Sequence, residues 1–565
     1  MVSNPWVLAA VAAAGAAAYL YQRLSYLRFR QYAHLPQTEP HLIWGHLLAV
    51  DKFMREATTE DGLVGGTDVV FANIMASIGN PEIMLVDVRP FNHPILFIRS
   101  HLVAEQVSKQ TKLMPYSVGK SPTMEFVTPI TGPNSIITLS GHKWKDLRKR
   151  FNPGFAPQHI LSLLPVITSK AKPFVKRLDD YVKSGERFTL EPLLTSLTFD
   201  IIGAVTMNMD FNAQLPKEQQ SELVQNYQNL LATYKADDGA TPWWMNPHTR
   251  LKRYFLRKPV DNYMKQYVRE KAQEIKTSEK KDRSVLALSL QDGEELSNEL
   301  VDTTIDQLKS FMFAGHDTTS ILLQWAIYEV YRHPRVLKTL RAELDRVIGT
   351  DLDPQVIYDA FNTRGDEIMR EMSYTSAVVK EILRMHPPAG TARYAPPGTG
   401  FHVKLADGSS VCVDGTILFN CQDQIQMDPE VYGPTVYDFM PERWLGNVNT
   451  SAEAEDVAGE DEKAAVSQAS ETEIPASAWR PFERGPRNCI GQELANIEGR
   501  FILACVVRRY DFTKVGRGEA KLGPDGKPLV DEKGKHVSDN EPFGVRQITS
   551  RPNDGIEMRV KLREL

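Results

Sequence analysis

The sequence has few cysteines for its length and no excess of positive charge. Only four of its 565 residues are cysteine, and no two of them form a C-x-x-C pair. A disulfide framework is therefore excluded, and zinc or dithiol chemistry is disfavoured. The 66 basic residues are outnumbered by 71 acidic ones, so no global positive field indicates nucleic-acid binding. With 42% hydrophobic and 24% charged residues, the composition is that of a globular protein with a large core.

Charged residues are also absent from a 17-residue stretch near the N-terminus, Pro5 to Tyr21. Its length is at the lower end of what spans a bilayer. No Lys or Arg precedes the stretch, whereas Arg23, Arg28 and Arg30 follow it, so the positive-inside rule places the body of the protein on the cytosolic side. We predict a single-pass membrane anchor with its basic flank over residues 1–30. A cleavable signal peptide and a buried N-terminal helix are the alternatives.

Helical periodicity dominates the rest of the chain. Apolar residues recur at three- and four-residue spacing in the segments 159–184, 216–235, 258–276, 296–331, 334–348, 367–386 and 491–508. Short strand-like runs occur near 83–98, 400–404, 410–420, 509–514 and 555–562. We therefore predict a mainly α fold with a minor β region.

Two compositional changes punctuate this pattern. After a Pro- and Gly-containing turn linker at 31–50, we predict one large domain over 51–565. Within it, residues 446–478 form an acidic low-complexity insert with eight acidic residues, one Lys and no aromatic residue. Such a segment buries too little apolar surface to order itself. Residues 515–541 form a second, polar insert rich in Gly, Lys and Asp.

One cysteine lies in a distinctive string, Phe482-Glu-Arg-Gly485-Pro-Arg487-Asn-Cys489-Ile-Gly491. A Gly/Pro turn precedes Cys489 and a helical pattern follows it, which places the sulfur at a helix N-terminus where a thiolate is favoured. The glycines allow the backbone to approach a large flat group, and Arg487 offers a cation to an anionic one. A lone cysteine at a helix start is more often a buried structural thiol, but the full F-x-x-G-x-R-x-C-x-G string is far more specific.

This string resembles the haem-binding loop of the cytochrome P-450 superfamily, the haem-thiolate monooxygenases. The resemblance implies that Cys489 is the axial ligand to the iron of haem b and that Arg487 contacts a haem propionate. It assigns Phe482, Gly485 and Gly491 to the same cofactor loop. Thiolate ligation donates electron density that favours O–O cleavage, which ties the residue type to the chemistry.

Further signatures of the family follow one another along the chain. Glu381 and Arg384 form an E-x-x-R pair one helical turn apart, and the segment Pro441-Glu-Arg443-Trp resembles the one that completes a Glu-Arg-Arg network. Its implied role is structural. Arg393 matches a second propionate partner.

The segment Trp144-Lys-Asp-Leu-Arg148 places an indole and a guanidinium at i and i+4. The resemblance implies that both address haem propionates, whereas a basic amphipathic helix is the alternative interpretation. The neighbouring basic residues, at positions 143, 145, 149 and 150, suit a docking surface for an acidic redox partner whose association weakens as salt rises.

An acid and two hydroxyl residues lie inside the long apolar helix predicted at 296–331, in the string Ala314-Gly315-His316-Asp317-Thr318-Thr. Polar residues at such a place are unfavourable unless they serve a purpose, and glycine costs about 1 kcal/mol of helix propensity. The string resembles the family's A/G-G-x-D/E-T-T/S motif. The resemblance makes Thr318 the alcohol that steadies bound oxygen and Asp317 the acid that delivers protons, with a capped or kinked core helix as the alternative.

The resemblance implies a single haem domain that inserts one oxygen atom of O₂ into a lipophilic molecule. NADPH would supply electrons through a separate NADPH–cytochrome reductase, with a b-type cytochrome as an alternative donor. The setting would be the endoplasmic reticulum membrane, with the catalytic domain cytosolic and no nucleic acid involved. The narrower resemblance is to microsomal fungal members acting in secondary metabolism. A reductase-independent haem-thiolate isomerase or dehydratase and a non-catalytic haem protein remain the alternatives.

The substrate pocket is expected, from the family's topology, near 115–135, 200–250, 306–318, 388–396 and 543–549. Its expected apolar lining consists of Phe126, Phe311, Phe313, Ala389 and Phe543. Such a lining suits polyketides, terpenoids and fatty acyl chains equally.

Overall fold

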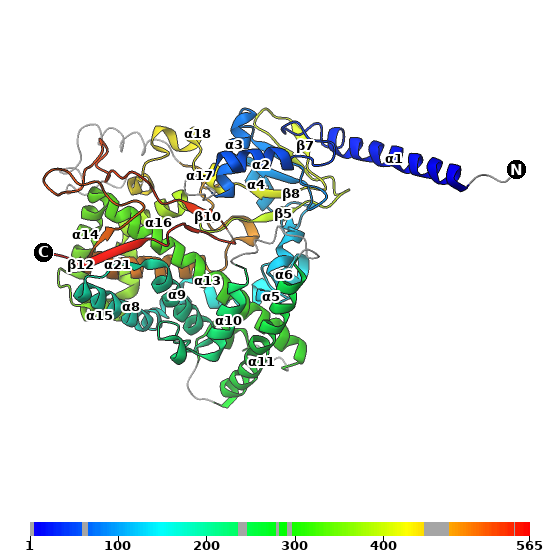
Figure 1. Ribbon diagram of the computed structural model, residues 1–565. Helices are drawn as coiled ribbons and strands as arrows, with labels where there is room; N and C mark the ends of the chain where they lie inside the picture. Colours follow the sequence, from blue (N-terminus) through cyan, green and yellow to red (C-terminus); the bar gives the residue numbers. More distant parts are fainter. Residues whose placement is uncertain are drawn as a thin grey trace. The chain divides into compact units, whose positions relative to one another are not determined.

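The computed structural model of the chain divides into two compact units, which we describe separately (Figure 1). The described residues are 5–58, 66–234, 246–277, 282–290, 296–445, 474–546 and 548–565. The first unit comprises residues 1–121 and 391–425, and the second comprises 122–390 and 426–565. Most of the acidic insert, residues 446–473, lies outside the described residues.

The first unit is built on a five-stranded sheet. Its strand order is β1-β2-β8-β5-β3, and β2 pairs with β8 in parallel whereas the other neighbours are antiparallel. The strands are β1 (Ile83–Val86), β2 (Ile95–Ile98), β3 (Gly119–Lys120), β5 (Ala392–Tyr394) and β8 (Ile417–Asn420), beside the hairpin of β6 (His402–Lys404) and β7 (Ser410–Cys412). The helices are α1 (Pro5–Phe29), α2 (Leu47–Glu56), α3 (Thr67–Ser77) and α4 (His101–Ser108). Three of the predicted strand runs, at 83–98, 400–404 and 410–420, thus contribute to this unit.

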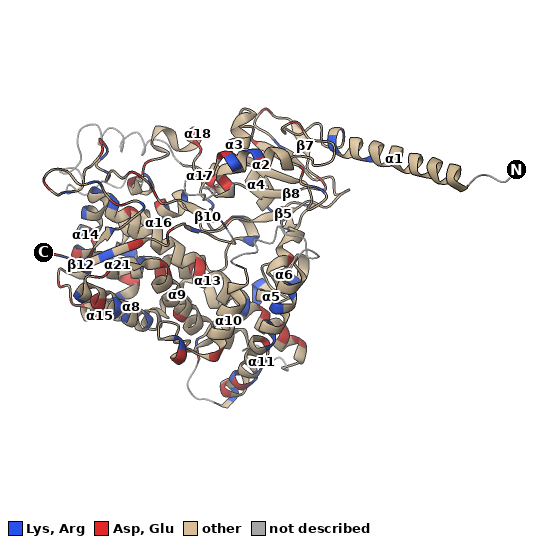
Figure 2. Ribbon diagram, in the orientation of Figure 1, with Lys and Arg blue, Asp and Glu red and all other residues tan. Residues whose placement is uncertain are grey.

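The helix α1 is long and apolar. An 18-residue window within its 25 residues has a mean hydropathy of 1.3 and is not buried against the protein. Figure 2 shows α1 without acidic residues and with basic ones only toward its C-terminal end. At that end Arg28 is buried, forms an ion pair with Asp87 at 2.6 Å and donates to the Arg89 carbonyl at 2.7 Å. The helix is therefore long enough to cross a membrane and is fixed to the sheet at its base.

The second unit holds most of the helices around the long central helix α13 (Asn298–Arg332). Its other long helices include α6 (Gly141–Phe151), α8 (Leu164–Ser184), α9 (Leu190–Met207), α10 (Glu222–Ala232), α11 (Pro247–Thr277), α14 (Pro334–Ile348), α15 (Pro354–Glu371), α16 (Ser373–Met385) and α21 (Gln492–Arg509). Two small sheets complete it: β4 (Phe188–Thr189), β12 (Glu557–Leu562) and β9 (Tyr510–Lys514) in the first, and β10 (Gly544–Arg546) with β11 (Ser550–Pro552) in the second. The predicted mainly α fold is confirmed.

Two helices differ from the sequence prediction for physical reasons. The helix α9 is buried on nearly every face, so its sequence has no amphipathic period to detect, although its composition would also suit a membrane span. The predicted helix at 367–386 is two helices that meet at Met372. The second one begins there because the Glu343 carboxylate, on α14, accepts hydrogen bonds from the backbone N–H groups of Tyr374 and Thr375 at 2.6 and 2.8 Å.

The polar insert at 515–541 is folded back onto the second unit. Its residues form isolated bridges, Leu522 with Pro528 and Val530 with His536. The His536 N–H donates to the carbonyl of Arg332 at 2.9 Å, and Lys533 pairs with Asp438 at 2.6 Å. The first contact attaches the insert to the C-terminal end of α13, and the second attaches it to the segment that holds Asp438.

Candidate active site

Cys489 lies at the end of a tight loop just before α21. Its backbone N–H donates to the Phe482 carbonyl at 2.8 Å, which closes the loop. Gly485 has φ +73°, a left-handed conformation that a residue with a Cβ adopts only at a cost. A Cβ on Gly491 would lie 3.9 Å from the sulfur. The loop thus leaves the Cys489 side chain exposed at a helix N-terminus, as the sequence predicts.

Two arginines and a tryptophan predicted for the cofactor gather around this loop. The Arg487 guanidinium lies 4.7 Å from the centre of the Trp144 ring and donates to the Ser140 hydroxyl at 3.3 Å. Arg148, one turn after Trp144 on α6, donates to the carbonyl and side-chain oxygens of Asn488 at 2.7 and 2.9 Å. Burial lowers the pKa of Arg148, while the neighbouring sulfur of Cys489 opposes that change. The sequence prediction assigned both arginines to the same cofactor, but it did not identify Asn488 as the residue to which Arg148 donates.

A fully buried charge network lies behind the loop. Glu381 accepts two hydrogen bonds from Arg384, at 2.9 and 2.8 Å, and one from Arg443 at 3.0 Å. The Trp444 indole N–H donates to it at 2.9 Å. Burial alone would raise the pKa of Glu381, but the two guanidinium groups hold that pKa below its usual value. The Glu-Arg-Arg network predicted from the sequence is present.

The acid–alcohol motif lies in the middle of α13, which runs through it as one helix. The Thr318 hydroxyl donates to the Ala314 carbonyl at 2.7 Å, which leaves its lone pairs as acceptors. Ala314 is exposed and Thr318 half-buried, although the turns on either side are largely buried. A Cβ on Gly315 would come within 2.7 Å of Ile202 on α9, so this glycine permits close helix packing rather than a break in α13.

The acid–alcohol motif and Cys489 both come shortly before the point where α13 and α21 pack together. Helices α13 and α21 pack together where Leu322 lies against Gly499, whose Cβ would come to 3.2 Å of the leucine side chain. Thr318 precedes Leu322 by one turn, about 6 Å along α13 at 1.5 Å per residue. Cys489 precedes the first residue of α21. Each residue therefore lies before this contact along its own segment of the chain, Cys489 exposed and Thr318 half-buried.

Asp317 is held by partners that the sequence did not reveal. One amino group of Arg551, on β11, donates to both carboxylate oxygens at 3.0 Å each. The Thr549 hydroxyl donates to the same carboxylate. The other amino group of Arg551 donates to Glu191 on α9 at 2.8 Å. Thr549 and Arg551 lie more than 230 positions after Asp317. The pocket segment expected at 543–549 includes Thr549 but ends before Arg551, so no local pattern identified the arginine.

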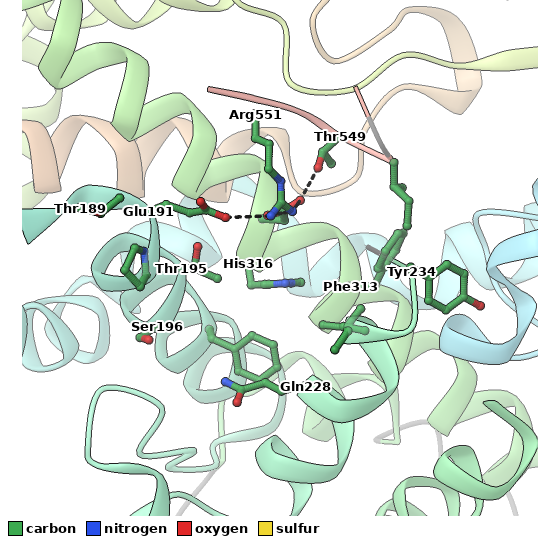
Figure 3. A pocket seen from close by; sticks show the side chains of 16 residues that line it. Thr189, Glu191, Thr195, Ser196, Gln228, Tyr234, Phe313, His316, Thr549 and Arg551 are labelled. Carbon is green, nitrogen blue, oxygen red and sulfur yellow. Dashed lines mark hydrogen bonds and ion pairs between the residues drawn. The ribbon is translucent and has the colours of Figure 1, made fainter. Parts of the chain in front are cut away.

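A cavity of about 600 Å³ opens beside this cluster (Figure 3). Its walls come from α9, α10, α13 and the segment before β11. Phe313 lines it, as predicted. Phe311 does not serve as predicted: its ring packs in the core against Phe151 and Phe155, with centroids 5.4 and 4.9 Å away. His316 lines the cavity while its Nδ1 is within 2.7 Å of the Met312 carbonyl, and burial lowers its pKa.

Arg393, the second predicted propionate partner, lies on β5 in the first unit, where its side chain is buried. Its assignment to the cofactor stays a prediction.

The residues around Cys489 fit a haem by their chemistry. A soft sulfur donor stands exposed at a helix N-terminus, the ligand type that iron in haem-thiolate proteins takes. Two cations, the buried Arg487 and the half-buried Arg148, flank it, which suits a macrocycle that carries two carboxylates. Trp144 is 4% exposed and backs Arg487, so that cation is fixed in place.

Comparison with known proteins agrees with this geometry. The family model described as Cytochrome P-450 matches residues 82–532. The cytochrome P-450 monooxygenase acrF of Aspergillus aculeatus is 31% identical over 492 residues, which cover 86% of this chain and 94% of the relative. The cytochrome P-450 monooxygenase polC of Polytolypa hystricis is 26% identical over 568 residues, covering 97% and 96%. Human cytochrome P-450 4V2 is 25% identical over 478 residues, covering 79% and 77%.

Proposed function

Because the chain belongs to the cytochrome P-450 family, we propose that it inserts one oxygen atom of O₂ into a lipophilic small molecule with electrons from NADPH through a separate reductase. The observation that carries this proposal is the pairing of an exposed Cys489 with an intact Asp317–Thr318 motif in one unit. The haem bound at Cys489 supplies the activation of O₂. Similarity to two fungal monooxygenases supports a fungal setting, which we expect to be secondary metabolism.

Each site residue then has a definite task. Cys489 ligates the iron, Arg487, Arg148 and Trp144 hold the propionate side of the haem, and Arg393 is proposed as a further cation for it. Phe482, Gly485 and Gly491 shape the loop that presents the sulfur. Thr318 offers acceptor lone pairs on the accessible face of α13, and Asp317 supplies protons beside it.

Electron delivery is proposed to use the exposed face of α6. Lys143, Lys145 and Lys149 are exposed there, whereas Arg150 is half-buried and donates to the Ser289 carbonyl at 2.9 Å. The three lysines suit an acidic docking face on an NADPH–cytochrome reductase or a b-type cytochrome. Because surface charges are screened by salt, electron transfer should slow as ionic strength rises.

Replacing Thr318 by Ala tests the function directly. In vesicles that contain the holoprotein and an NADPH–cytochrome reductase, the unmodified protein should oxidise a lipophilic substrate only when NADPH, O₂ and the reductase are all present. Thr318→Ala should keep consuming O₂ but release it mainly as hydrogen peroxide, because the proton-handling hydroxyl is gone. Product and peroxide are measured per NADPH oxidised.

The matched control for this experiment is Thr319→Ala, which removes the hydroxyl of the neighbouring, buried threonine. It should leave the product-to-peroxide ratio close to that of the unmodified protein. Substrate conversion without NADPH or reductase would instead support the isomerase alternative. An unchanged ratio in Thr318→Ala would contradict the role given to this residue.

Membrane attachment is proposed to depend on α1, as a single-pass anchor in the endoplasmic reticulum with the catalytic unit in the cytosol. Deleting residues 5–22 removes most of the apolar helix but keeps Arg28 and its pairing with Asp87. The shortened protein should move from the membrane fraction to the soluble fraction of a cell lysate with its haem retained. Arg28→Ala in the full chain is the control, which should lower stability without releasing the protein. Retention of the shortened protein in the membrane would contradict α1 as the anchor.

A further inference from the structure

One guanidinium group connects two carboxylates at the cavity. Arg551 donates through one amino group to both oxygens of Asp317 and through the other to Glu191. In Figure 3 a dashed line joins Glu191 to Arg551, and a second one starts at the hydroxyl of Thr549. The three elements α9, α13 and β11 therefore meet at a single cation. Asp317 and Glu191 therefore compete for the single positive charge of Arg551.

Water can reach this cluster from the cavity side. Hydroxyl and amide side chains line the cavity together with Glu191, which is a third exposed. They are Thr189, Thr195, Ser196, Gln228 and Thr549. A space of about 600 Å³ with many polar partners is roomy enough to hold water. The Asp317 carboxylate, 14% exposed, lies at its edge.

The alcohol of the motif lies on another face of α13. Of the described α13 residues, Phe313, His316 and Asp317 line the cavity, whereas Ala314 and Thr318 do not. At 3.6 residues per turn, Ala314 and Thr318 share a face about 150° away from the one that Phe313 and His316 share. Asp317 falls between the two faces. Its carboxylate is thus the group that can take a proton from the cavity and pass it toward Thr318.

We propose that Arg551 is a positioning residue that holds the Asp317 carboxylate at the cavity edge, and that Glu191, by sharing Arg551, sets how firmly Asp317 is held. This inference rests on the proposed monooxygenase function. A proton passes from cavity water to an Asp317 oxygen and then toward the Thr318 hydroxyl. The guanidinium keeps all of its protons throughout, and no electrons move within the cluster.

Asp317 and Glu191 compete for Arg551, and this competition predicts opposite effects for the loss of Glu191 and the loss of Arg551. When Asp317 takes up a proton it becomes a weaker partner, and Arg551 can then shift its charge toward Glu191. Without Glu191, the whole cation would remain on Asp317 and oppose protonation. Without Arg551, Asp317 would bind its proton more tightly and release it less readily. The two losses therefore have opposite effects on the same carboxylate.

The other titratable group at the cluster is His316. It lies on α13 beside Asp317, is 7% exposed and has its Nδ1 within 2.7 Å of the Met312 carbonyl. Burial lowers its pKa, so the ring is neutral at neutral pH and adds no charge there. Among the described residues that line the cavity, the charged groups beside Asp317 are Arg551 from β11 and Glu191 from α9.

The test compares Arg551→Gln and Glu191→Gln in the holoprotein. Infrared spectra of the resting protein are recorded against pH, and the protonated-carboxyl band of Asp317 is assigned by its loss in Asp317→Asn. The band should appear at higher pH in Arg551→Gln and at lower pH in Glu191→Gln than in the unmodified protein. The acidic limb of the pH–rate profile should move in the same two directions. Asp317→Asn itself should lower turnover about 100-fold or more, the usual contribution of a positioned acid.

Two controls separate positioning from a general effect of charge or folding. Arg559→Gln removes an exposed arginine of β12 and should leave the band unmoved. Arg551→Lys keeps the cation without the two-pronged donor, so the band should lie between those of the unmodified protein and Arg551→Gln. If Arg551→Gln does not fold, the shift expected in Glu191→Gln still decides the question.

A band that stays in place, or moves in the same direction in both variants, overturns the proposal even if all proteins turn over substrate. Loss of NADPH-dependent oxygenation in the unmodified protein would overturn the proposed function instead, while the infrared comparison would still report on the cluster.

Discussion

Glu381→Gln is expected to destabilise the protein by about 3–5 kcal/mol, the usual cost of removing one partner from a buried ion pair. Glu381 is fully buried and accepts hydrogen bonds from two buried arginines. The amide has no charge to balance Arg384 and Arg443 and offers one acceptor oxygen in place of two. Denaturant unfolding should show a lower midpoint with an unchanged slope, and the yield of haem-loaded protein should fall.

Asp366→Asn provides the matched control for this prediction. Asp366 also pairs with an arginine on the same helix, Arg370 at 2.9 Å, but both side chains are more than half exposed. Its loss should change stability by less than about 1 kcal/mol. Similar effects of the two substitutions would show that the Glu381 network does not stabilise the core as described.

Loss of the Cys489 sulfur should have the largest effect on function. Cys489→Ala should abolish NADPH-supported turnover, because it removes the sulfur that we propose as the protein ligand of the haem iron. The fold should survive, since the loop is closed by the backbone bond from Cys489 to Phe482, which does not involve the side chain. Haem content, turnover and the unfolding midpoint are measured together.

Two further variants make this result specific to sulfur ligation. Cys489→Ser keeps the size and polarity of the side chain but replaces the soft donor with a hard one, and it should also lose turnover. Cys412→Ala removes a half-buried cysteine of the first unit and should retain both haem and activity. Turnover that persists in Cys489→Ser would exclude the thiolate role.

Local patterns in the sequence were sufficient to predict much of the fold and of the site. The string around Cys489 combines turn glycines, a cation and a helix start within ten residues, so its local geometry follows from short-range rules. The Glu381–Arg384 pair follows from a spacing of one helical turn, whereas the third member of the network, Arg443, was expected only from the resemblance to the family. Long amphipathic helices such as α8 and α14 were found from their periodicity.

Features that depend on distant segments could not be predicted in this way. Arg551 meets Asp317 only because β11 lies against α13 in the folded chain. The start of α16 is fixed by Glu343 from another helix. Phe311 was expected in the pocket because it is apolar and close to the motif. It precedes the cavity-lining Phe313 by two residues, and two residues along a helix rotate a side chain by about 200°. Its ring therefore packs against Phe151 in the core.

The most direct test of the central claim is the carbon monoxide difference spectrum of the reduced, purified full-length protein. Ligation of the haem by the Cys489 thiolate predicts the strongly red-shifted Soret band of haem-thiolate proteins, and this band should be absent in Cys489→Ala. A spectrum typical of histidine-ligated haem, or no haem in folded protein, would contradict the account.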